Sequence, residues 1–431
     1  MVQVAISKAA DYDEAEKAVR EAVKLLGGTK KFVHAGDVVV VKPNSTIYTP
    51  PEMPITTHPA VVAAVAKLAK EADAKKVIVG DNPAFNFPAR MCFEYNGIEA
   101  AAREAGAEVS YFDEEPYVPV KVPGGVIYEV VKLPKPVADA DVVISVAKMK
   151  THSCTVATLC IKNLHGLNTW EDKKGIHKAD LGQKFVDIVK AIKGKLRLSV
   201  VDGICAMEGQ GPSGGFPVDM GLVLAGDNIV AVDAVASACM GIDPMEVPTT
   251  QIATYQGLGP AALHEITVKG ENIKEVMRPF KRAILQFASK DPNVTLYLGG
   301  ACLGGCIHTM EPQYDFIPRD SNKKYAIIVG MNPIIPHKNL NVDEVWVVGD
   351  CAISCVEKMD LEPRPTRVFE GCPPLLDEFF DDFCGLIPEI FPEGHPRVSG
   401  RGIWVPREEF LAGGKRQGKN RQQSPFNRKG A

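Results

Sequence analysis

Short apolar runs that end in glycine or in a polar residue recur through the first two thirds of the chain. The segments between them, such as HPAVVAAVAKLAKEADA, carry apolar residues at helical spacing. Continuous apolar strands that alternate with helices are typical of a largely parallel sheet with helices on both faces. The pattern therefore predicts an α/β fold with a large, mostly parallel sheet. The runs cover residues 38–41, 77–79, 142–146, 198–201 and 222–224.

The same pattern predicts two α/β domains and a tail. Residues 1–290 are expected to form the large domain. A second series of strands then predicts a smaller, cysteine-rich α/β domain of flavodoxin-like layout over residues 293–395. Residues 396–431 end in a stretch with six lysines and arginines and no acid, and its low apolar content predicts a basic, flexible tail.

The overall charge and the apolar runs argue against some partners and locations. The 431 residues carry a formal net charge of −4, so nucleic acid is not expected as a partner. The N-terminus has no basic stretch followed by an apolar run, which predicts that there is no secretory signal. No run of about 18 apolar residues occurs, so no membrane span is expected. The chain is therefore predicted to be cytoplasmic.

Eleven cysteines are many for a chain in a reducing compartment, where metal binding or redox chemistry is commoner than disulfides. Three predicted strands of the smaller domain carry cysteine just beyond their carboxyl ends, where neighbouring parallel strands line one crevice. Within each C-x-x-x-C pair, a helix that follows the strand places both thiols on one face. The candidate metal ligands are Cys302, Cys306, Cys351, Cys355 and Cys372.

Thiolates in groups of four suit either an iron–sulfur cluster or zinc. Structural zinc commonly uses C-x-x-C pairs, which are absent from this sequence, so the pattern favours an iron–sulfur cluster of the [4Fe-4S] type. Zinc and unligated, redox-active thiols remain the alternatives. Because five cysteines exceed four ligands, we expect Cys302, Cys306, Cys351 and Cys372 to bind, with Cys355 as the alternate ligand.

A second group of polar residues follows the apolar strands of the large domain. Lys148, Lys150 and His152 alternate, so in an extended chain their side chains point the same way. Lysines beside histidine favour a small anionic ligand, and histidine can move protons near neutral pH. These three residues and His177 are the candidate catalytic residues; the alternative is that the lysines are solvated. The expected binding residues in the same crevice are Lys42, Asn44, Asp81, Lys162, Asn163 and Asp202.

Three further features allow two interpretations each. The glycine-rich stretch 202–215 is expected to be a loop, which either closes over the crevice or cradles a phosphate. Asp233 lies in an apolar helical stretch, where it either makes a local hydrogen bond or belongs to the site. His58 precedes a proline and either ends a helix or lines the crevice.

Ordered motifs over residues 35–245 resemble the domain of unknown function 362 family. The resemblance implies an association with iron–sulfur clusters, which in that family frequently comes through an appended ferredoxin module. The ferredoxin run C-x-x-C-x-x-C is absent here, and the cysteine-rich domain takes its place. The motifs are V-K-P-N, T-x-H-P, K-x-K-T-H, K-N-L-x-G, D-G-I-x-A-M-E-G-x-G-P and A-V-D-A.

Two shorter resemblances concern the cysteines and the layout. The GCPP of residues 371–374 resembles the motif that supplies a cluster-ligating cysteine in nickel–iron hydrogenase small subunits and the related subunit of respiratory complex I. The layout of the large domain is similar to that of the nickel-pincer lactate racemase family, which likewise has lysine and histidine near strand ends.

These features support three hypotheses of function. The first is an iron–sulfur redox enzyme or electron-transfer protein of anaerobic metabolism, acting on a small anionic ligand or a redox protein partner. The second is a non-redox racemase, epimerase or lyase with lysine and histidine as acid–base groups and a structural cluster. The third is a protein that delivers a metal or cofactor to a client, with the basic tail as the contact. The sequence leaves open whether the chain forms a homo-oligomer.

Overall fold

The computed structural model describes residues 2–84, 87–152, 155–175, 181–283, 293–298, 322–330, 332–333, 335, 337–369, 397–398 and 404–405. The chain divides into two units at residues 284/285, and each unit is treated by itself. The predicted domain limits at 290 and 293 stay predictions, because most of the residues around them lie outside the described part.

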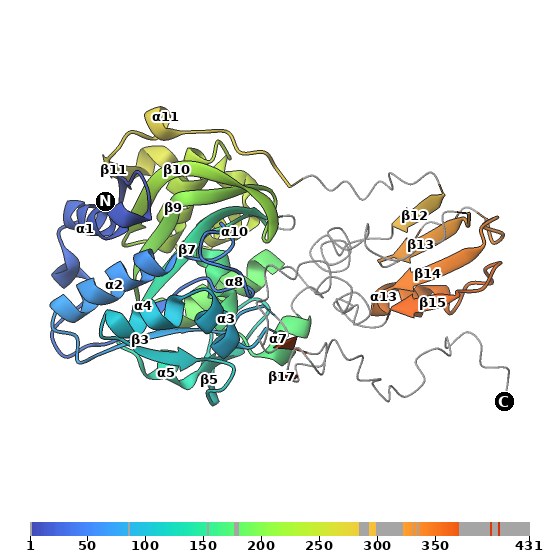
Figure 1. Cartoon of the computed structure of the whole chain (residues 1–431), viewed down its shortest axis with the longest axis horizontal. Helices are drawn as coiled ribbons and strands as arrows, with labels where there is room; N and C mark the ends of the chain where they lie inside the picture. The colour runs from blue at the N-terminus through green and yellow to red at the C-terminus, as the bar shows by residue number, and fades with distance from the viewer. Residues whose placement is uncertain are drawn as a thin grey trace. The chain divides into compact units, whose positions relative to one another are not determined.

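The first unit is built on a nine-stranded sheet with the order β11-β1-β10-β9-β7-β2-β3-β4, in which β8 also pairs with β7 (Figure 1). Strand β7 lies near the middle and pairs in parallel with both β2 and β9, and β3 pairs in parallel with β2 and β4. The prediction of a large, mostly parallel sheet is confirmed. The strands are β1 (Val2–Lys8), β2 (Val38–Lys42), β3 (Lys76–Asp81), β4 (Glu108–Tyr111), β7 (Val142–His152), β8 (Val156–Thr158), β9 (Leu196–Gln210), β10 (Gly214–Gly226) and β11 (Ile266–Gly270).

Strand β10 departs from the parallel pattern, because it runs antiparallel to both β1 and β9. The glycine-rich stretch 202–215 is therefore mostly the end of β9 and the start of β10 rather than a loop, and that expectation was wrong. An antiparallel pair can be joined by a few residues, whereas parallel strands need a long crossover. The apolar pattern of residues 222–224 shows a strand but does not show its direction.

Helices cover both faces of the sheet, as the alternating pattern predicts. One face packs against α1 (Ala15–Leu25), α2 (Pro59–Glu71), α3 (Ala89–Tyr95) and α4 (Ile98–Glu104). The other face packs against α5 (Lys135–Asp139), α6 (Cys160–Asn163), α8 (Leu181–Ile192), α9 (Ile229–Cys239) and α10 (Pro248–Tyr255). The remaining helices of this unit are α7 (Trp170–Gly175) and α11 (Ile273–Val276).

The burial of α1 and α9 follows from their sequences. Helix α1 buries alanines and valines at three- and four-residue spacing and exposes lysine and glutamate between them, as expected of a helix on a surface. Helix α9 buries all eleven of its residues. A helix that is apolar on every side is enclosed by other elements.

A hairpin of β5 (Tyr117–Lys121) and β6 (Val130–Pro134) forms a separate two-stranded sheet in the first unit. Among the described residues, no helix has the length and apolar character needed to cross a bilayer.

The second unit contains a four-stranded parallel sheet in the order β12-β13-β14-β15. Both faces of β13 and β14 are buried, which fits their unbroken apolar runs. The flavodoxin-like layout stays a prediction, because several connections between these strands lie outside the described residues. The elements are β12 (Val294–Leu298), β13 (Tyr325–Val329), β14 (Glu344–Val348), α13 (Asp350–Val356), β15 (Arg367–Phe369), and the pair β16 (Arg397–Val398) and β17 (Trp404–Val405).

Candidate functional site

Polar residues at the carboxyl ends of β2 and β3, within β9 and near the end of β7 lie buried in the first unit. Lys42 is the last residue of β2, and Asp81 is the last residue of β3. Lys148 of β7 is the register partner of Asp202 of β9. All four side chains are 0–2% exposed, so any charge that they carry must be compensated inside the protein.

Lys42 and Asp81 form a buried ion pair, with Nζ 2.7 Å from Oδ1. The other carboxylate oxygen of Asp81 accepts hydrogen bonds from the backbone N–H and the hydroxyl of Ser45. Lys42 Nζ also donates to the carbonyl of Pro43 and to Oδ1 of Asn163. Burial lowers the pKa of Lys42, and the Asp81 carboxylate opposes that shift. Both charged groups therefore have a full set of partners.

Gly166 lies directly against this ion pair. A Cβ atom at this position would be 1.8 Å from Asp81 Oδ1 and 2.7 Å from Lys42 Nζ. Such distances are far below van der Waals contact, so the close approach requires glycine. The glycine of the K-N-L-x-G motif therefore has a physical role beside the pair.

Lys173 of α7 is a second buried lysine on this side of the site, and it has no carboxylate partner among the described residues. Its Nζ donates to the carbonyl oxygen of Asn82 at 2.7 Å and to that of Pro83. Burial lowers the pKa of Lys173 to about 7, against the opposing effect of Asp81. We call this part of the site the Lys173 region, made of Lys42, Asp81, Asn163, Gly166 and Lys173.

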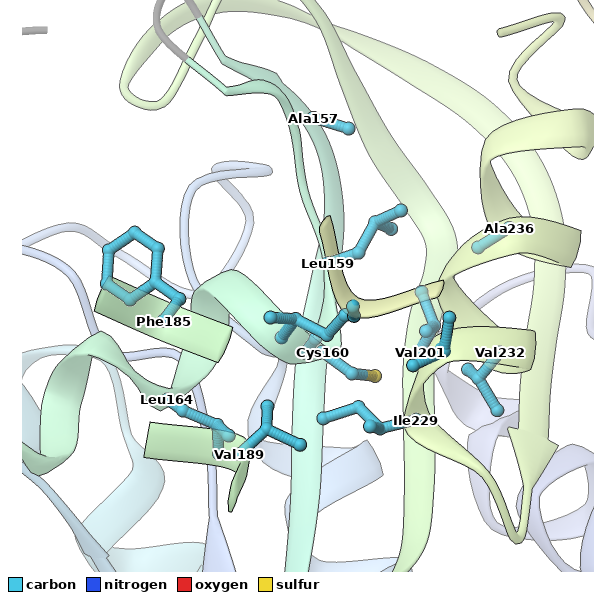
Figure 2. Packing of buried hydrophobic residues seen from close by; sticks show 14 of the residues in the cluster. Ala157, Leu159, Cys160, Leu164, Phe185, Val189, Val201, Ile229, Val232 and Ala236 are labelled. Atoms are coloured by element: carbon cyan, nitrogen blue, oxygen red, sulfur yellow. The ribbon is translucent and has the colours of Figure 1, made fainter. Parts of the chain in front are cut away.

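Helix α6, which carries Lys162 and Asn163, is held by a carboxylate from α9. Asp233 accepts hydrogen bonds from the backbone N–H groups of Cys160 at 2.7 Å and Ile161 at 2.9 Å, which have no partner within the helix. Figure 2 shows Cys160 at this helix start among apolar side chains such as Ile229. Burial raises the pKa of Asp233 to about 7, and the two N–H donors oppose that shift. These hydrogen bonds reach residues 72 and 73 positions away, so they are tertiary rather than local, and they hold the helix that carries Asn163 of the site.

Lys148 and Asp202 form a second buried ion pair, with Nζ 3.0 Å from Oδ2. Tyr12 joins this pair: its hydroxyl accepts from Lys148 Nζ at 2.7 Å and donates to Asp202 Oδ1 at 3.3 Å. Burial raises the pKa of Tyr12, and the Asp202 carboxylate raises it further. Tyr12 therefore stays protonated and bridges the two charged groups.

His58 lies against the same cluster and also begins α2. Its ring stacks on Tyr12 with centroids 3.6 Å apart, and its backbone N–H donates to Asp202 Oδ2. Its Nδ1 accepts from the backbone N–H of Ala60, which caps the helix. Burial lowers the pKa of His58, Asp202 opposes that shift, and Lys148 adds to it. Both interpretations of His58, a helix terminus and a member of the site, therefore describe its position.

Lys150 of β7 is fully buried and has no carboxylate partner among the described residues. Its Nζ donates to the hydroxyl of Thr46 at 3.1 Å and to the carbonyl of Ile55 at 2.7 Å. Burial lowers the pKa of Lys150 well below its ordinary value, and the nearby cations Lys162 and Lys148 lower it further. We call this part of the site the Lys150 region, made of Tyr12, Thr46, His58, Lys148, Lys150 and Asp202.

Thr46 is held in an unusual backbone conformation beside this amine. Its φ of 27° lies in the left-handed region, which β-branched residues rarely adopt. Its hydroxyl donates to Asn44 Oδ1, so it can only accept from Lys150. Strained residues of this kind persist where surrounding contacts hold them, and they cluster at functional sites.

The remaining predicted site residues have different surroundings. His152 ends β7, is 5% exposed, and accepts at Nδ1 from the backbone N–H of Thr155. Lys162 is half-buried, with Nζ 4.9 Å from the ring centroid of Phe185. His177 lies outside the described residues.

Sequence reasoning missed Tyr12, Thr46 and Lys173 as members of the site. None of them directly follows an apolar run, and Lys173 stands in the polar run WEDKK, which is typical of an exposed helix. The signal that could have indicated Thr46 is its position within two residues of Asn44 in the V-K-P-N motif.

Comparisons with known proteins agree with the motif resemblance. Residues 39–238 match the domain of unknown function (DUF362) family. The chain is 33% identical over 277 residues to Thylakoid-associated protein sll1697 of Synechocystis sp., which covers 61% of this chain and 84% of that protein. The chain belongs to the DUF362 family. The thylakoid association in that name applies to that relative only. The cytoplasmic location predicted for this DUF362 protein stays a prediction.

A lactate racemase apoprotein from Thermoanaerobacterium thermosaccharolyticum is similar in structure, with a TM-score of 0.37 and 11% identity. The similarity covers 76% of this chain and 69% of that chain. A TM-score of this size is too low to assign a function to the DUF362 protein.

The candidate cysteine ligands lie beyond the DUF362 match, in the second unit. Cys351 and Cys355 lie one turn apart on α13, which follows β14, and both are half-buried free thiols. The backbone N–H of Asn332, beyond β13, donates to Cys355 Sγ at 3.3 Å. The part of the chain that is described contains no group of three metal-binding side chains. The other predicted ligands, Cys302, Cys306 and Cys372, lie outside the described residues.

Proposed function

We propose that the first unit is an enzyme that transfers protons on a small anionic substrate, as a racemase, epimerase or lyase does. Its reactive group is the amine of Lys150. The observation that supports this proposal is that Lys150 is fully buried and that, among the described residues, its Nζ donates only to two neutral oxygens, those of Thr46 and Ile55.

The number of acceptors matches an uncharged amine. An ammonium group has three N–H donors, whereas a neutral amine has two donors and a lone pair. In the described part of the chain, Lys150 has two acceptors, so a charged form would leave one buried N–H unsatisfied, at a cost of about 1–3 kcal/mol. The paired lysines differ, because Lys42 and Lys148 each donate to a carboxylate.

Deuterium exchange tests the proposal without knowledge of the product. The protein in D2O, with a panel of small 2-hydroxy, 2-oxo and 2-amino acids, should remove one proton NMR signal of at least one compound. That signal is the C2 proton of a hydroxy or amino acid, or the C3 protons of an oxo acid. Lys150→Met should abolish the exchange, because the variant lacks the amine that acts on the substrate. Lys70→Met, at an exposed position of α2, is the matched control and should keep it. Exchange that persists in Lys150→Met would contradict the assignment.

As a second candidate, we propose that the second unit holds a [4Fe-4S] cluster and makes the protein an iron–sulfur redox enzyme or electron-transfer component. The support is the position of Cys351 and Cys355 one turn apart after a parallel strand, with the Asn332 N–H on one sulfur. Hydrogen bonds from backbone N–H to sulfur are a means of tuning cluster potentials. When bound, the cluster would supply one-electron transfer, and its four ligands would be Cys302, Cys306, Cys351 and Cys372, with Cys355 as the alternate ligand.

Iron and sulfide analysis with EPR on anaerobically purified protein tests this candidate. About four irons per chain are expected of a [4Fe-4S] cluster. Cys351→Ser should lower the iron content, whereas Cys239→Ser, in the buried helix α9 of the first unit, should leave it unchanged. Protein without iron, or equal iron in both variants, would remove the candidate.

A further inference from the structure

We propose that Lys150 bonds covalently to its substrate, forming an imine between Nζ and the carbonyl carbon of a small compound that also carries a carboxylate. This inference rests on the proposed function, because it names the substrate class of the same site. It adds a covalent step that the proposed proton transfer does not require.

The hydrogen bonds of Lys150 leave its lone pair as the reactive position. Both N–H groups of the neutral amine have acceptors, Thr46 Oγ1 and Ile55 O, and Thr46 Oγ1 is itself engaged as a donor to Asn44. The lone pair is therefore free of a donor among the described residues. Both acceptors lie on the segment 43–57 between β2 and α2.

The charges around Lys150 favour a nucleophile rather than a base. A general base works best when its pKa lies near the working pH, but the cations of Lys162 and Lys148 disfavour proton uptake at Lys150. Lysines that are desolvated and lie beside other cationic groups are instead activated as nucleophiles toward carbonyl compounds. The same two cations favour a substrate with a carboxylate next to its carbonyl group.

The step balances without any further reactant. The Nζ lone pair adds to the carbonyl carbon to give a carbinolamine, and the carbonyl oxygen then leaves as water with the two hydrogens that Nζ held. Protonation of the imine by solvent leaves one N–H, which can still donate to Ile55 O. The resulting cation draws electrons from the neighbouring C–H bond, and the hydrogen of that bond is the one that the site transfers.

Lys173 is the natural comparison, since its amine also donates only to neutral oxygens. Asp81 raises and Lys162 lowers the pKa of both amines, but their weight differs. At Lys173 the largest effect of a neighbouring charge is that of Asp81, whereas at Lys150 it is that of Lys162, and Lys148 adds to it. The proposal therefore assigns the covalent bond to Lys150 and not to Lys173.

Reductive trapping tests the proposal on the full chain. Pyruvate and sodium cyanoborohydride at neutral pH should reduce the imine to a stable secondary amine, which peptide mass spectrometry then locates. The adduct at Lys150 should exceed that at the exposed Lys70 at least about tenfold, because an ordinary lysine with a pKa near 10.4 is less than about 0.1% uncharged at neutral pH. Acetone, which lacks the carboxylate, should label Lys150 less than pyruvate does.

The two proposals fail in different ways. Label on exposed lysines or on Lys173, with none on Lys150, overturns the imine. If deuterium exchange still depends on Lys150 in that case, the proposed function stands with a non-covalent amine. If Lys150→Met also keeps its exchange, the proposed function fails as well. Trapping on the native chain needs no variant, so a folding defect cannot imitate the trapping result.

Discussion

The Lys173 region and the Lys150 region each hold one lysine that is paired with an aspartate and one that donates only to neutral oxygens. In the Lys173 region, Asp81 pairs with Lys42 at 2.7 Å and also lies near the unpaired amine. Burial lowers the pKa of Lys173, and this carboxylate limits the fall, so the pKa is about 7.

The balance of charges differs in the Lys150 region. Its aspartate, Asp202, accepts hydrogen bonds from Lys148, Tyr12 and the backbone N–H of His58. At Lys150 the cations of Lys162 and Lys148 lower the pKa further, and Asp81 opposes them with a smaller effect. The difference teaches that burial lowers the pKa of both unpaired lysines, and that the balance of neighbouring charges decides whether that fall is limited or increased.

The largest expected effect comes from breaking either ion pair. Asp81→Asn and Asp202→Asn should each lower the free energy of unfolding by about 3–5 kcal/mol, because each leaves a buried lysine without its counter-charge. Urea unfolding measures this loss. In the double variant Lys42→Met/Asp81→Asn, much of the loss should be recovered, since no unpaired charge remains. A loss below about 1 kcal/mol for one aspartate would mean that its region is not held by the pair.

Gly166→Ala tests the Lys173 region, because Gly166 lies against the ion pair of Lys42 and Asp81. Its Cβ would overlap Asp81 Oδ1 at 1.8 Å, so we expect a loss of about 2–4 kcal/mol in unfolding free energy. Gly194→Ala is the matched control, because no atom lies within 4 Å of its Cβ. Its stability should change by no more than about 0.5 kcal/mol. Equal effects in the two variants would show that the close contact at Gly166 is not important for stability.

The two unpaired lysines should give different pH dependences of stability. Each has a lower pKa in the folded chain than in the unfolded chain, so the unfolded chain binds more protons between the two values, and stability rises with pH. For Lys173 this window runs from about pH 7 to about 10.4, with a slope of about 1.4 kcal/mol per pH unit.

Lys173→Met should therefore reduce the rise of the unfolding free energy with pH between about pH 7 and about 10.4. Lys150→Met should flatten it from a lower pH onward, since the pKa of Lys150 is well below its ordinary value. Unfolding measured at several pH values gives both slopes. If the two variants flatten the same window, the contrast between the regions is wrong.

The smallest expected effect comes from substitution of His58, a member of the Lys150 region. His58→Ala should cost about 1 kcal/mol through loss of the α2 cap, whereas His58→Asn should keep most of the stability, because asparagine is also a good cap. By NMR, His58 should titrate below its ordinary pKa. Asp202→Asn should lower that pKa further, since the carboxylate favours the protonated ring. A rise of the pKa in Asp202→Asn would contradict this arrangement.

The sequence predicted those parts of the site that follow from strand order. Lys42, Asp81 and Asp202 were predictable because each ends or follows an apolar run, and parallel strands end at a common edge. The shared direction of Lys148 and Lys150 was predictable from alternation along a strand, and in the structure both are fully buried.

The other features depend on tertiary contacts, which no local sequence pattern predicts. Lys173 lies in a polar helix, and only tertiary structure places its amine against the carbonyls of residues 82 and 83. Tyr12 stands near the N-terminus, far in sequence from the pair that it bridges. The direction of β10 was missed for a similar reason, because an apolar run is the same in parallel and antiparallel strands.

Asp233 of α9 affects the position of a site residue that it does not contact. Helix α6 has only four residues, and so short a helix is not stable by itself. The Asp233 carboxylate of α9 therefore fixes the orientation of α6. It thereby also positions Asn163, which accepts a hydrogen bond from Lys42 Nζ. Substitutions in α9 can thus change the charged centre through α6 without contacting it. Evolution or design can therefore change the charged centre by substitutions in α9.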